Sequence, residues 1–87
     1  MRINNKSVES YKLLHKNNEI SKRQIEVLFC LRKLGTATNR MIAKKLKWDI
    51  NRVTGRVTEL RDKRLVEYAG EYEDKETNRT VNLWKCN

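Results

Sequence analysis

The sequence predicts a mainly α-helical domain that ends in a small β-hairpin. Between residues 21 and 63, apolar residues recur at spacings of three and four, the spacing of amphipathic helices. From residue 65 onward, two runs of alternating apolar and polar residues flank a polar segment, as in two antiparallel strands. The 87 residues, 38% of them hydrophobic, suffice for one modest core. We therefore expect a three-helix core and a two-stranded hairpin at residues 20–87, after an N-terminal extension at residues 1–19.

The first core helix is marked at both ends. Ser21 and Gln24 have the spacing of a capping box. Ile20 and Ile25 have that of a hydrophobic staple, and Gly35 stands where a helix C-terminus favours glycine. Its apolar band predicts the central helix of the core and consists of Ile25, Val27, Leu28, Cys30, Leu31 and Leu34, with Phe29 at the margin.

The N-terminal extension carries a helical pattern of its own. Ser7 is a suitable N-cap, and Val8, Tyr11 and Leu14 follow at helical spacing. We expect a short amphipathic helix that packs on the domain or meets a second copy of the chain, which would make a homodimer through residues 7–16.

Two more helices, joined by a tight turn, follow the first. Thr38 and Asp49 are residue types that cap helix N-termini, and Trp48 can pack on Val53 as a staple. The inward positions are Ile42, Ala43 and Leu46 in the earlier helix, and Ile50, Val53, Val57 and Leu60 in the later one. This pair of helices predicts a helix-turn-helix unit.

The outward face of the later helix, residues 49–63, is polar. It carries Asn51, Arg52, Gly55, Thr58, Glu59 and Asp62, with Arg56 on its flank. Asn and Arg can bond bidentately to base edges in the major groove, and recognition helices use their N-terminal residues to do so. Gly55 costs about 1 kcal/mol of helix propensity relative to Ala, which suggests that another molecule approaches the backbone there. The predicted base-reading residues are Asn51, Arg52, Gly55 and Arg56; the alternative is a solvated helix face with a neutral glycine.

The preceding helix supplies candidates for contacts with the DNA backbone. Helix N-termini and Lys or Arg side chains bind phosphate. These criteria select Thr38, Asn39, Arg40, Lys44 and Lys47. For each lysine taken singly, ordinary solubilising charge is an equally good explanation.

The hairpin is predicted from strands at residues 65–72 and 80–86, with a polar loop at residues 73–79 in which Asn78 suits a positive φ. The side chains expected to face the helices are Val66, Tyr68, Val81 and Leu83. Trp84 would then lie on the other face or at the sheet edge, where it either covers the end of the core or meets a partner.

The charge of the chain favours a polyanionic partner. Twenty Lys and Arg residues against eleven Asp and Glu residues give a net charge of +9 and a pI near 9.9. Residues 1–35 carry +5 (eight basic, three acidic), residues 36–64 carry +6 (nine basic, three acidic), and residues 65–87 carry −2 (three basic, five acidic). Nucleic acid is therefore the leading partner class, and the acidic hairpin should contact it only through a small tip.

Other functional classes lack support in the sequence. No apolar run could span a bilayer, and MRINNKSVES lacks the apolar core of a signal peptide, so we expect a cytoplasmic protein. Cys30 and Cys86 have no companion ligands at metal spacing and are expected to be buried thiols. His15 lies in a polar segment, and we find no phosphate-binding loop, acid pair or nucleophile with a base. We therefore predict no enzyme activity, no cofactor and no metal site.

The helix order and the segment ATNRMIAKKLKWDINRVTGRVTELRDKRLV, with the closing strand NLW, resemble the winged helix-turn-helix family over roughly residues 20–86. The chain is similar to MarR-like regulators and, more closely, to small winged-helix proteins of phages and prophages. The resemblance implies that the later helix enters the major groove, and that a wing tip formed by Lys75, Asn78 and Arg79 touches the adjacent minor groove or phosphates. The sequence departs from the family in the acidic stretch EYEDKE and in Arg64, where a glycine is usual, so we expect a different turn there.

Three functions follow for testing. The first is sequence-specific binding of double-stranded DNA by a small transcriptional regulator, dimeric because one module buries little DNA. The second is a protein-docking winged helix, such as a phage factor that binds a host enzyme or a defence complex through the acidic wing, Trp84 and the N-terminal helix. The third and lowest-ranked is Z-DNA binding. It is suggested by INRV and the late tryptophan, although Gly55 stands where such proteins carry a stacking tyrosine and the wing lacks their prolines.

Overall fold

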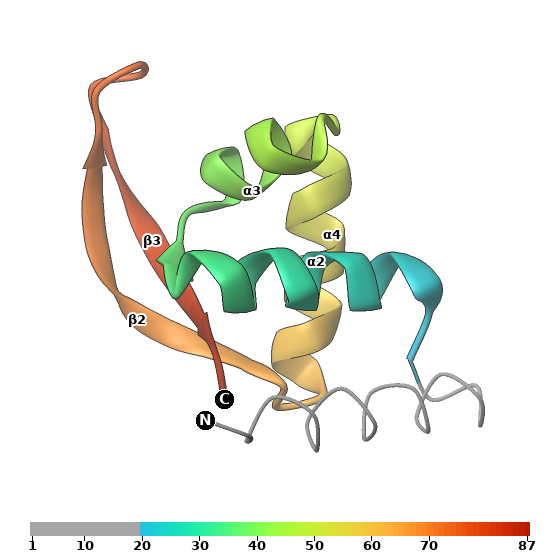
Figure 1. The fold of residues 1–87 in the computed structure, drawn as a ribbon. Helices are drawn as coiled ribbons and strands as arrows, with labels where there is room; N and C mark the ends of the chain where they lie inside the picture. The colour runs from blue at the N-terminus through green and yellow to red at the C-terminus, as the bar shows by residue number, and fades with distance from the viewer. Residues whose placement is uncertain (1–19) are drawn as a thin grey trace.

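The computed structural model describes residues 20–87. In chain order, its elements are α2 (Lys22–Leu34), β1 (Thr36–Ala37), α3 (Asn39–Leu46), α4 (Ile50–Asp62), β2 (Val66–Asp74) and β3 (Arg79–Cys86). α2 crosses α4, α3 lies above α2, and the hairpin of β2 and β3 extends beside α3 (Figure 1). The predicted fold class is confirmed, whereas the helix predicted at residues 7–16 lies outside the described residues.

The ends of α2 are those that the sequence predicts. Ser21 Oγ accepts a hydrogen bond from the Gln24 backbone N–H at 3.1 Å, and Gln24 Oε1 accepts one from the Ser21 N–H at 3.0 Å. At the other end, Gly35 has φ 85°, a conformation that glycine adopts without a Cβ clash, and its N–H donates to the Leu31 carbonyl. These caps satisfy backbone groups that the helix leaves without partners.

The turn between α3 and α4 is also built from caps. The Thr38 hydroxyl accepts from the Met41 N–H, and the Asp49 carboxylate accepts from the Asn51 N–H, both at 3.2 Å. Lys47 ends α3 in the left-handed conformation, with φ 61°. Both predicted N-caps are confirmed, and the cap at Asp49 sets the start of the candidate recognition helix.

The three helices and the sheet share one core. Its buried members are Ile20, Val27, Leu28, Cys30, Leu31, Ala37, Ile42, Ala43, Val53, Val57, Leu60, Val66 and Trp84. The predicted inner face of α4 is confirmed, with Ile50 at its half-buried end, and Phe29 lies at the core margin as predicted. Since each fully buried Val or Leu contributes roughly 1.5–3 kcal/mol, this packing determines which face of α4 remains in solvent.

The sheet has three strands, not the predicted two. Its order is β1-β3-β2, all antiparallel, with Thr36 paired to Lys85 and Ala37 to Trp84. A two-residue strand is too short to show an alternating pattern, which is why the sequence did not predict β1. The hairpin strands are also longer than predicted, so the turn contracts to residues 75–78; Asn78 has the expected positive φ, 56°.

The inward face of the hairpin differs from the predicted one. Trp84 is buried in the core at 5% exposure, so it covers the core and does not lie on the far face. Val66 is buried as predicted, but Tyr68 is 54% exposed, and Val81 and Leu83 are only half-buried. The cause is register: Val66 pairs with Cys86 and Tyr68 with Trp84, so the even-numbered positions of β3 face inward at this end. A bulge then follows in β2 before Gly70.

The turn from α4 into β2 places Arg64 at φ 63°. This is the left-handed conformation for which glycine is usual, so the arginine occupies the glycine geometry and the expected change of turn is not needed. The Arg64 N–H donates to the Arg61 carbonyl at 2.9 Å, and the Asn87 side chain donates to the Arg64 carbonyl at 2.8 Å. These bonds hold the strained residue in place.

Candidate nucleic-acid interface

The outward side of α4 is open at its N-terminal half. Asn51, Arg52 and Thr58 are exposed, and Gly55 lies between them; apart from the adjoining residues of α4, nothing in residues 20–87 lies within 4 Å of where a Cβ would stand. Packing within residues 20–87 therefore does not require a glycine at this position. This surface can admit another molecule close to the helix backbone.

Arg52 is positioned by an aromatic ring. Its guanidinium lies 5.6 Å from the ring centroid of Trp48, and the guanidinium of Arg23 lies 5.5 Å from the same ring. Cation–π contacts of this kind stabilise by about 0.5–1 kcal/mol at exposed sites. Trp48 thus brings together two cations at the start of α4, and one of them, Arg23, is a site residue that was not predicted.

Arg56 is turned toward α4 itself. Its Nε and Nη2 donate to Glu59 at 2.8 and 2.7 Å, and Gln24 Nε2 of α2 donates to the same carboxylate at 2.7 Å. The hydrogen bonds from Arg56, and then that from Gln24, lower the pKa of Glu59. Two of the donors that a base contact would use are therefore already engaged, unlike those of Arg52.

Thr54 belongs to the open surface, although it was not predicted. It is exposed, and its hydroxyl accepts from Asn39 Nδ2 at 3.2 Å and donates to the Ile50 carbonyl at 3.0 Å. Asn39 Oδ1 is buried without a hydrogen-bond partner in residues 20–87. The signal was present in the sequence, because Thr54 is three residues after Asn51 and four before Thr58, which places all three side by side.

The hairpin tip is held against α3 by two ion pairs. Arg40 Nε donates to Asp74 Oδ2 at 2.9 Å, and the Lys44 ammonium pairs with the Glu76 carboxylate. The Glu76 backbone N–H also donates to Asp74, and this hydrogen bond, followed by Arg40, lowers the pKa of Asp74. The two cations that were predicted to bind phosphate thus already have carboxylate partners.

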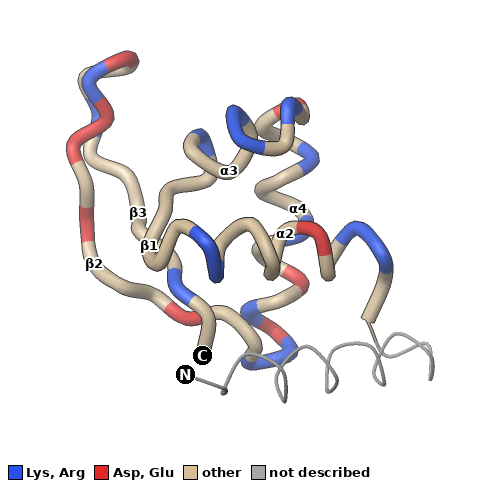
Figure 2. The backbone as a smooth tube through the Cα atoms, viewed as in Figure 1, with Lys and Arg blue, Asp and Glu red and all other residues tan. Residues whose placement is uncertain are grey.

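The other residues predicted to contact the DNA backbone differ in their exposure to solvent. Thr38 is buried at 3% exposure and its hydroxyl caps α3, so a phosphate there would meet backbone groups only. Lys47 is exposed, as are the wing residues Lys75, Asn78 and Arg79. Figure 2 shows Lys and Arg distributed over α2, α3 and α4, and Asp and Glu spaced along β2.

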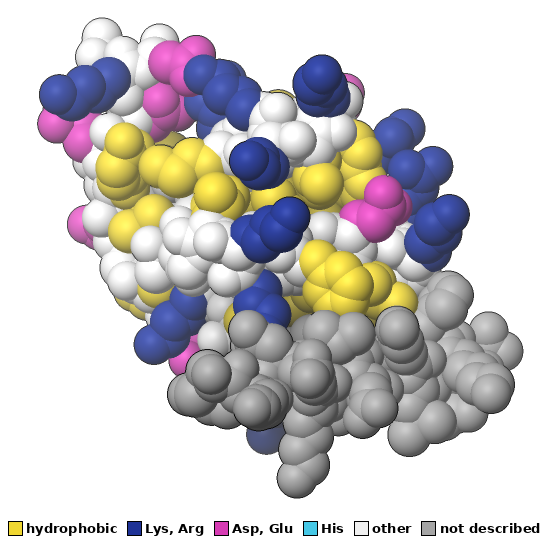
Figure 3. All heavy atoms as spheres, in the orientation of Figure 1, with side chains coloured by type: hydrophobic (Ala, Val, Ile, Leu, Met, Phe, Trp, Pro, Cys, Tyr) yellow, Lys and Arg dark blue, Asp and Glu magenta, His cyan; other side chains and the backbone are white. Residues whose placement is uncertain are grey.

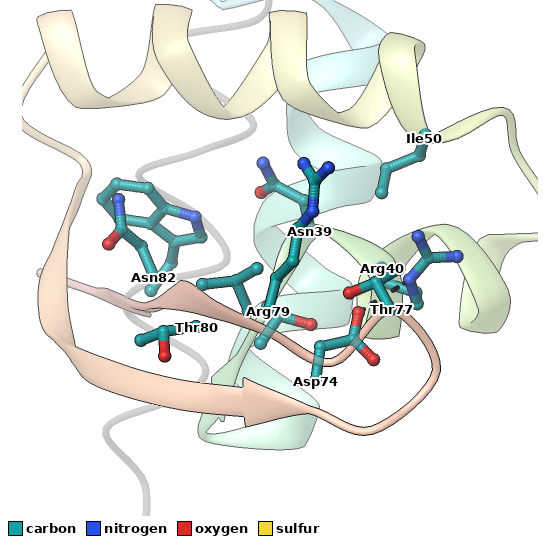
Figure 4. Close-up of a pocket in the computed structure, with 11 residues that line it drawn as sticks. Asn39, Arg40, Ile50, Asp74, Thr77, Arg79, Thr80 and Asn82 are labelled. Carbon is teal, nitrogen blue, oxygen red and sulfur yellow. Dashed lines mark hydrogen bonds and ion pairs between the residues drawn. The ribbon is translucent and has the colours of Figure 1, made fainter.

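A hollow of about 600 Å³ separates the hairpin from the N-termini of α3 and α4. Figure 4 shows Arg79 extending from β3 toward Asn39, with Asn82 on the same side and Arg40 beside Asp74 and Thr77. Arg79 forms no ion pair with another described residue. The lining residues are Thr38, Asn39, Arg40, Ile50, Asp74, Thr77, Arg79, Thr80, Val81, Asn82 and Trp84.

The sequence profile of the family described as the TFIIE alpha subunit matches residues 11–87. The chain belongs to the TFIIE alpha family. A search of curated protein sequences finds no match to this chain.

Solved structures of bacterial and archaeal regulators share the fold of this TFIIE alpha family protein. The "Multiple Antibiotic Resistance Repressor, MarR" matches with a TM-score of 0.69 and 24% identity, over 98% of this chain and 59% of that one. A possible transcriptional regulator from Methanosarcina mazei matches with a TM-score of 0.69 and 15% identity, over 90% of this chain and 65% of that one. A MarR family regulator from Neisseria meningitidis has a TM-score of 0.62 and 21% identity, over 99% and 57%. The chain therefore spans less than two thirds of each of these proteins, and the predicted MarR-like fold is confirmed.

The described part of this TFIIE alpha family protein contains no group of three or more potential metal ligands. Cys30 is buried and Cys86 half-buried, both as free thiols, and burial raises the pKa of each. Cys86 Sγ donates to the Leu28 carbonyl at 3.5 Å. Within residues 20–87, no helix has the length and apolar character needed to cross a membrane.

Proposed function

We propose that this protein binds double-stranded DNA by inserting the N-terminal half of α4 into the major groove. The observation that carries the proposal is the open polar surface of α4, with Asn51, Arg52 and Thr58 around Gly55, on a helix whose opposite face is buried. This surface lies within residues 36–64, which carry nine basic and three acidic residues. Asn and Arg at such positions are suited to adenine and guanine edges.

The contacts divide into reading and positioning residues. Arg52, oriented by Trp48, and Asn51 read base edges, and Thr54 adds a hydroxyl beside them. Lys47 and Arg79 bind phosphates on either side, together with Lys75 and Asn78 at the wing tip. Arg40 and Lys44 act mainly by fixing the wing, because their charges are already paired.

The biological role we propose is regulation of transcription in the cytoplasm by sequence-specific DNA binding. The family name, TFIIE alpha subunit, fits a protein that acts in transcription. One module of this size buries little DNA, so we propose that the protein binds as a dimer through residues 7–16. From the resemblance of its sequence, we also propose that the protein is of the phage or prophage type.

The test is selection of bound sites from a random duplex pool, followed by affinity measurements on the selected site over a range of salt. Arg52→Ala should weaken binding to that site by about 1–3 kcal/mol of binding free energy. Lys33→Ala removes the same charge from exposed α2 surface and serves as the matched control. Equal affinities for wild type and Arg52→Ala would show that α4 does not read the duplex.

A protein-docking role is the second candidate, favoured by the acidic residues of β2 on an otherwise basic chain. It predicts that the random pool yields no enriched sequence and that duplex binding is weak and lost at moderate salt. An enriched sequence motif would argue against this role as the main function.

A further inference from the structure

The outer edge of β2 takes no part in the proposed DNA contacts. Because the strand order is β1-β3-β2, one side of β2 has no partner strand among the described residues, and Figure 1 shows no described element beyond it. An edge strand exposes a row of N–H and C=O groups that can pair with another strand. At nine residues, β2 is long for an edge, since natural proteins often keep exposed edge strands short.

The side chains of this edge are acidic. Glu67, Glu71 and Glu73 are all exposed, on a chain whose net charge is +9. Glu67 pairs with Lys85 at 3.5 Å, whereas the residues opposite Glu71 and Glu73 in β3 are uncharged. Figure 3 shows Asp and Glu side chains gathered near the hairpin tip and Lys and Arg over the helices. Such an edge repels a phosphate backbone and attracts a cationic partner.

Two exposed tyrosines flank the same edge. Tyr68 is 54% and Tyr72 42% exposed. Their partners in β3 are Trp84 and Val81, positions of opposite parity, so the two rings lie on opposite faces of the sheet. Tyr combines a large apolar ring with a polar tip and is enriched at protein interfaces. A strand added to β2 would therefore find one tyrosine on each of its faces.

We propose that the free edge of β2 binds an extended basic segment of another protein by strand addition. Backbone hydrogen bonds join the two strands along residues 71–73, after the bulge that separates Tyr68 from Gly70. Glu71 and Glu73, on one face of the sheet, select Lys or Arg side chains, and the apolar residues between those cations pack on Tyr72 on the other face. A second copy of this chain is disfavoured at this edge, because antiparallel pairing would bring the glutamates of both copies together.

The experiment measures binding of a fluorescent peptide of alternating Lys and Val to the full chain at low salt. Glu71→Lys should weaken binding about fivefold, because it replaces an attraction by a repulsion. Glu26→Lys makes the same charge change on α2 and should leave the affinity near that of wild type. Equal weakening by both variants would show attraction to overall charge and would overturn the β2 assignment.

A second peptide separates strand pairing from charge. N-methylation of alternate backbone amides keeps every Lys but removes the donors that pair with an edge. Tight binding of the unmodified peptide and loss of binding by the N-methylated one support strand addition. Equal binding of the two overturns it, as does failure of wild type to bind either, which would leave the glutamates as protection of the edge against self-association.

Two further measurements keep the result interpretable. If Glu71→Lys loses the circular dichroism or the thermal transition of wild type, Glu71→Gln removes the charge without reversing it and is compared with Glu26→Gln. Duplex affinity of the Glu71 variants should equal or exceed that of wild type. Peptide binding at β2 and DNA binding at α4 can therefore fail or succeed separately.

Discussion

Asp74 at the end of β2 and Arg40 at the start of α3 form an ion pair that fixes the wing. Nε and Oδ2 are 2.9 Å apart, and the two side chains are 35% (Arg40) and 10% (Asp74) exposed. This contact and the ion pair of Lys44 with Glu76 neutralise two carboxylates of the wing with cations of α3. The acidic stretch EYEDKE is a departure from the usual DNA-binding wing. Its carboxylates at Asp74 and Glu76 position the tip against α3.

Replacing Asp74 by Asn should destabilise the protein in a pH-dependent way. The pKa of Asp74 is lowered from 3.8 by the Glu76 N–H and by Arg40, so the folded state favours the ionised carboxylate. Its contribution is complete above the unfolded pKa and is lost as pH falls through the folded pKa. Thermal unfolding should show wild type more stable than Asp74→Asn near neutral pH, with the difference shrinking below about pH 4. A difference that stays constant down to pH 2 would contradict the ion pair.

Removing the charge of Glu76 should strengthen DNA binding. Glu76→Gln releases Lys44, which then becomes available to a phosphate. If it makes that contact, the slope of log K against log salt should steepen by about 0.9. Glu67→Gln, which removes the same charge from β2 at a residue paired with Lys85, is the control and should leave the slope unchanged. An unchanged slope for Glu76→Gln would place Lys44 away from the duplex.

Arg56 and Arg52 should behave differently when truncated. Arg56 holds Glu59, which also accepts from Gln24 of α2, so Arg56→Ala should lower the thermal midpoint. Arg52 has no carboxylate partner within residues 20–87 and stacks on Trp48, so Arg52→Ala should mainly lower affinity for the selected site. Measuring both quantities for both variants decides the roles; a larger affinity loss for Arg56→Ala would restore it as the principal reader.

Arg64→Gly should stabilise the protein. A non-glycine residue at φ 63° carries a cost of roughly 1–2 kcal/mol, partly offset by the greater freedom of glycine in the unfolded chain, so we expect a gain of about 0.5–1 kcal/mol. The neighbouring Lys63, with φ −84°, offers the contrast: Lys63→Gly relieves no such cost and removes the hydrogen bond from Lys63 Nζ to Gln24 Oε1, so it should destabilise the protein. Denaturant unfolding measures both, and a loss on Arg64→Gly would mean that the arginine makes compensating contacts.

Local signals in the sequence were sufficient for the helices. Each N-cap that the structure shows, at Ser21, Thr38 and Asp49, was predicted because capping depends on residues within one turn of each other. The buried stripe of α4 was predicted for the same reason, since its period lies within a single helix. These features need no knowledge of the rest of the fold.

What the sequence could not supply depends on contacts between distant segments. The register that pairs Tyr68 with Trp84 turns Trp84 into the core, and the bulge that follows in β2 places Tyr72 on the other face; no residue pattern marks either feature. The ion pair of Arg40 with Asp74 joins positions 34 residues apart. From the sequence, Arg40 is therefore interpreted as a phosphate contact, and Asp74 as part of an acidic wing unsuited to DNA. The contact of Arg56 with Glu59 lies at helical spacing and could be predicted from the sequence, but Arg56 was interpreted as a base-reading residue on the flank of the outward face.

Gly55→Ala should separate stability from function. Apart from the adjoining residues of α4, no atom of residues 20–87 lies within 4 Å of the added Cβ. Ala exceeds Gly in helix propensity by about 1 kcal/mol, so the variant should unfold at higher temperature than wild type. If a duplex approaches the backbone of α4 at this point, the methyl group intrudes on the contact, and Kd for the selected site should rise about tenfold. Calorimetry and fluorescence anisotropy on the same preparation give both numbers. Greater stability with unchanged affinity would show that the DNA does not reach the helix at Gly55, and the reading surface would then have to be shifted toward Asn51 and the turn before it.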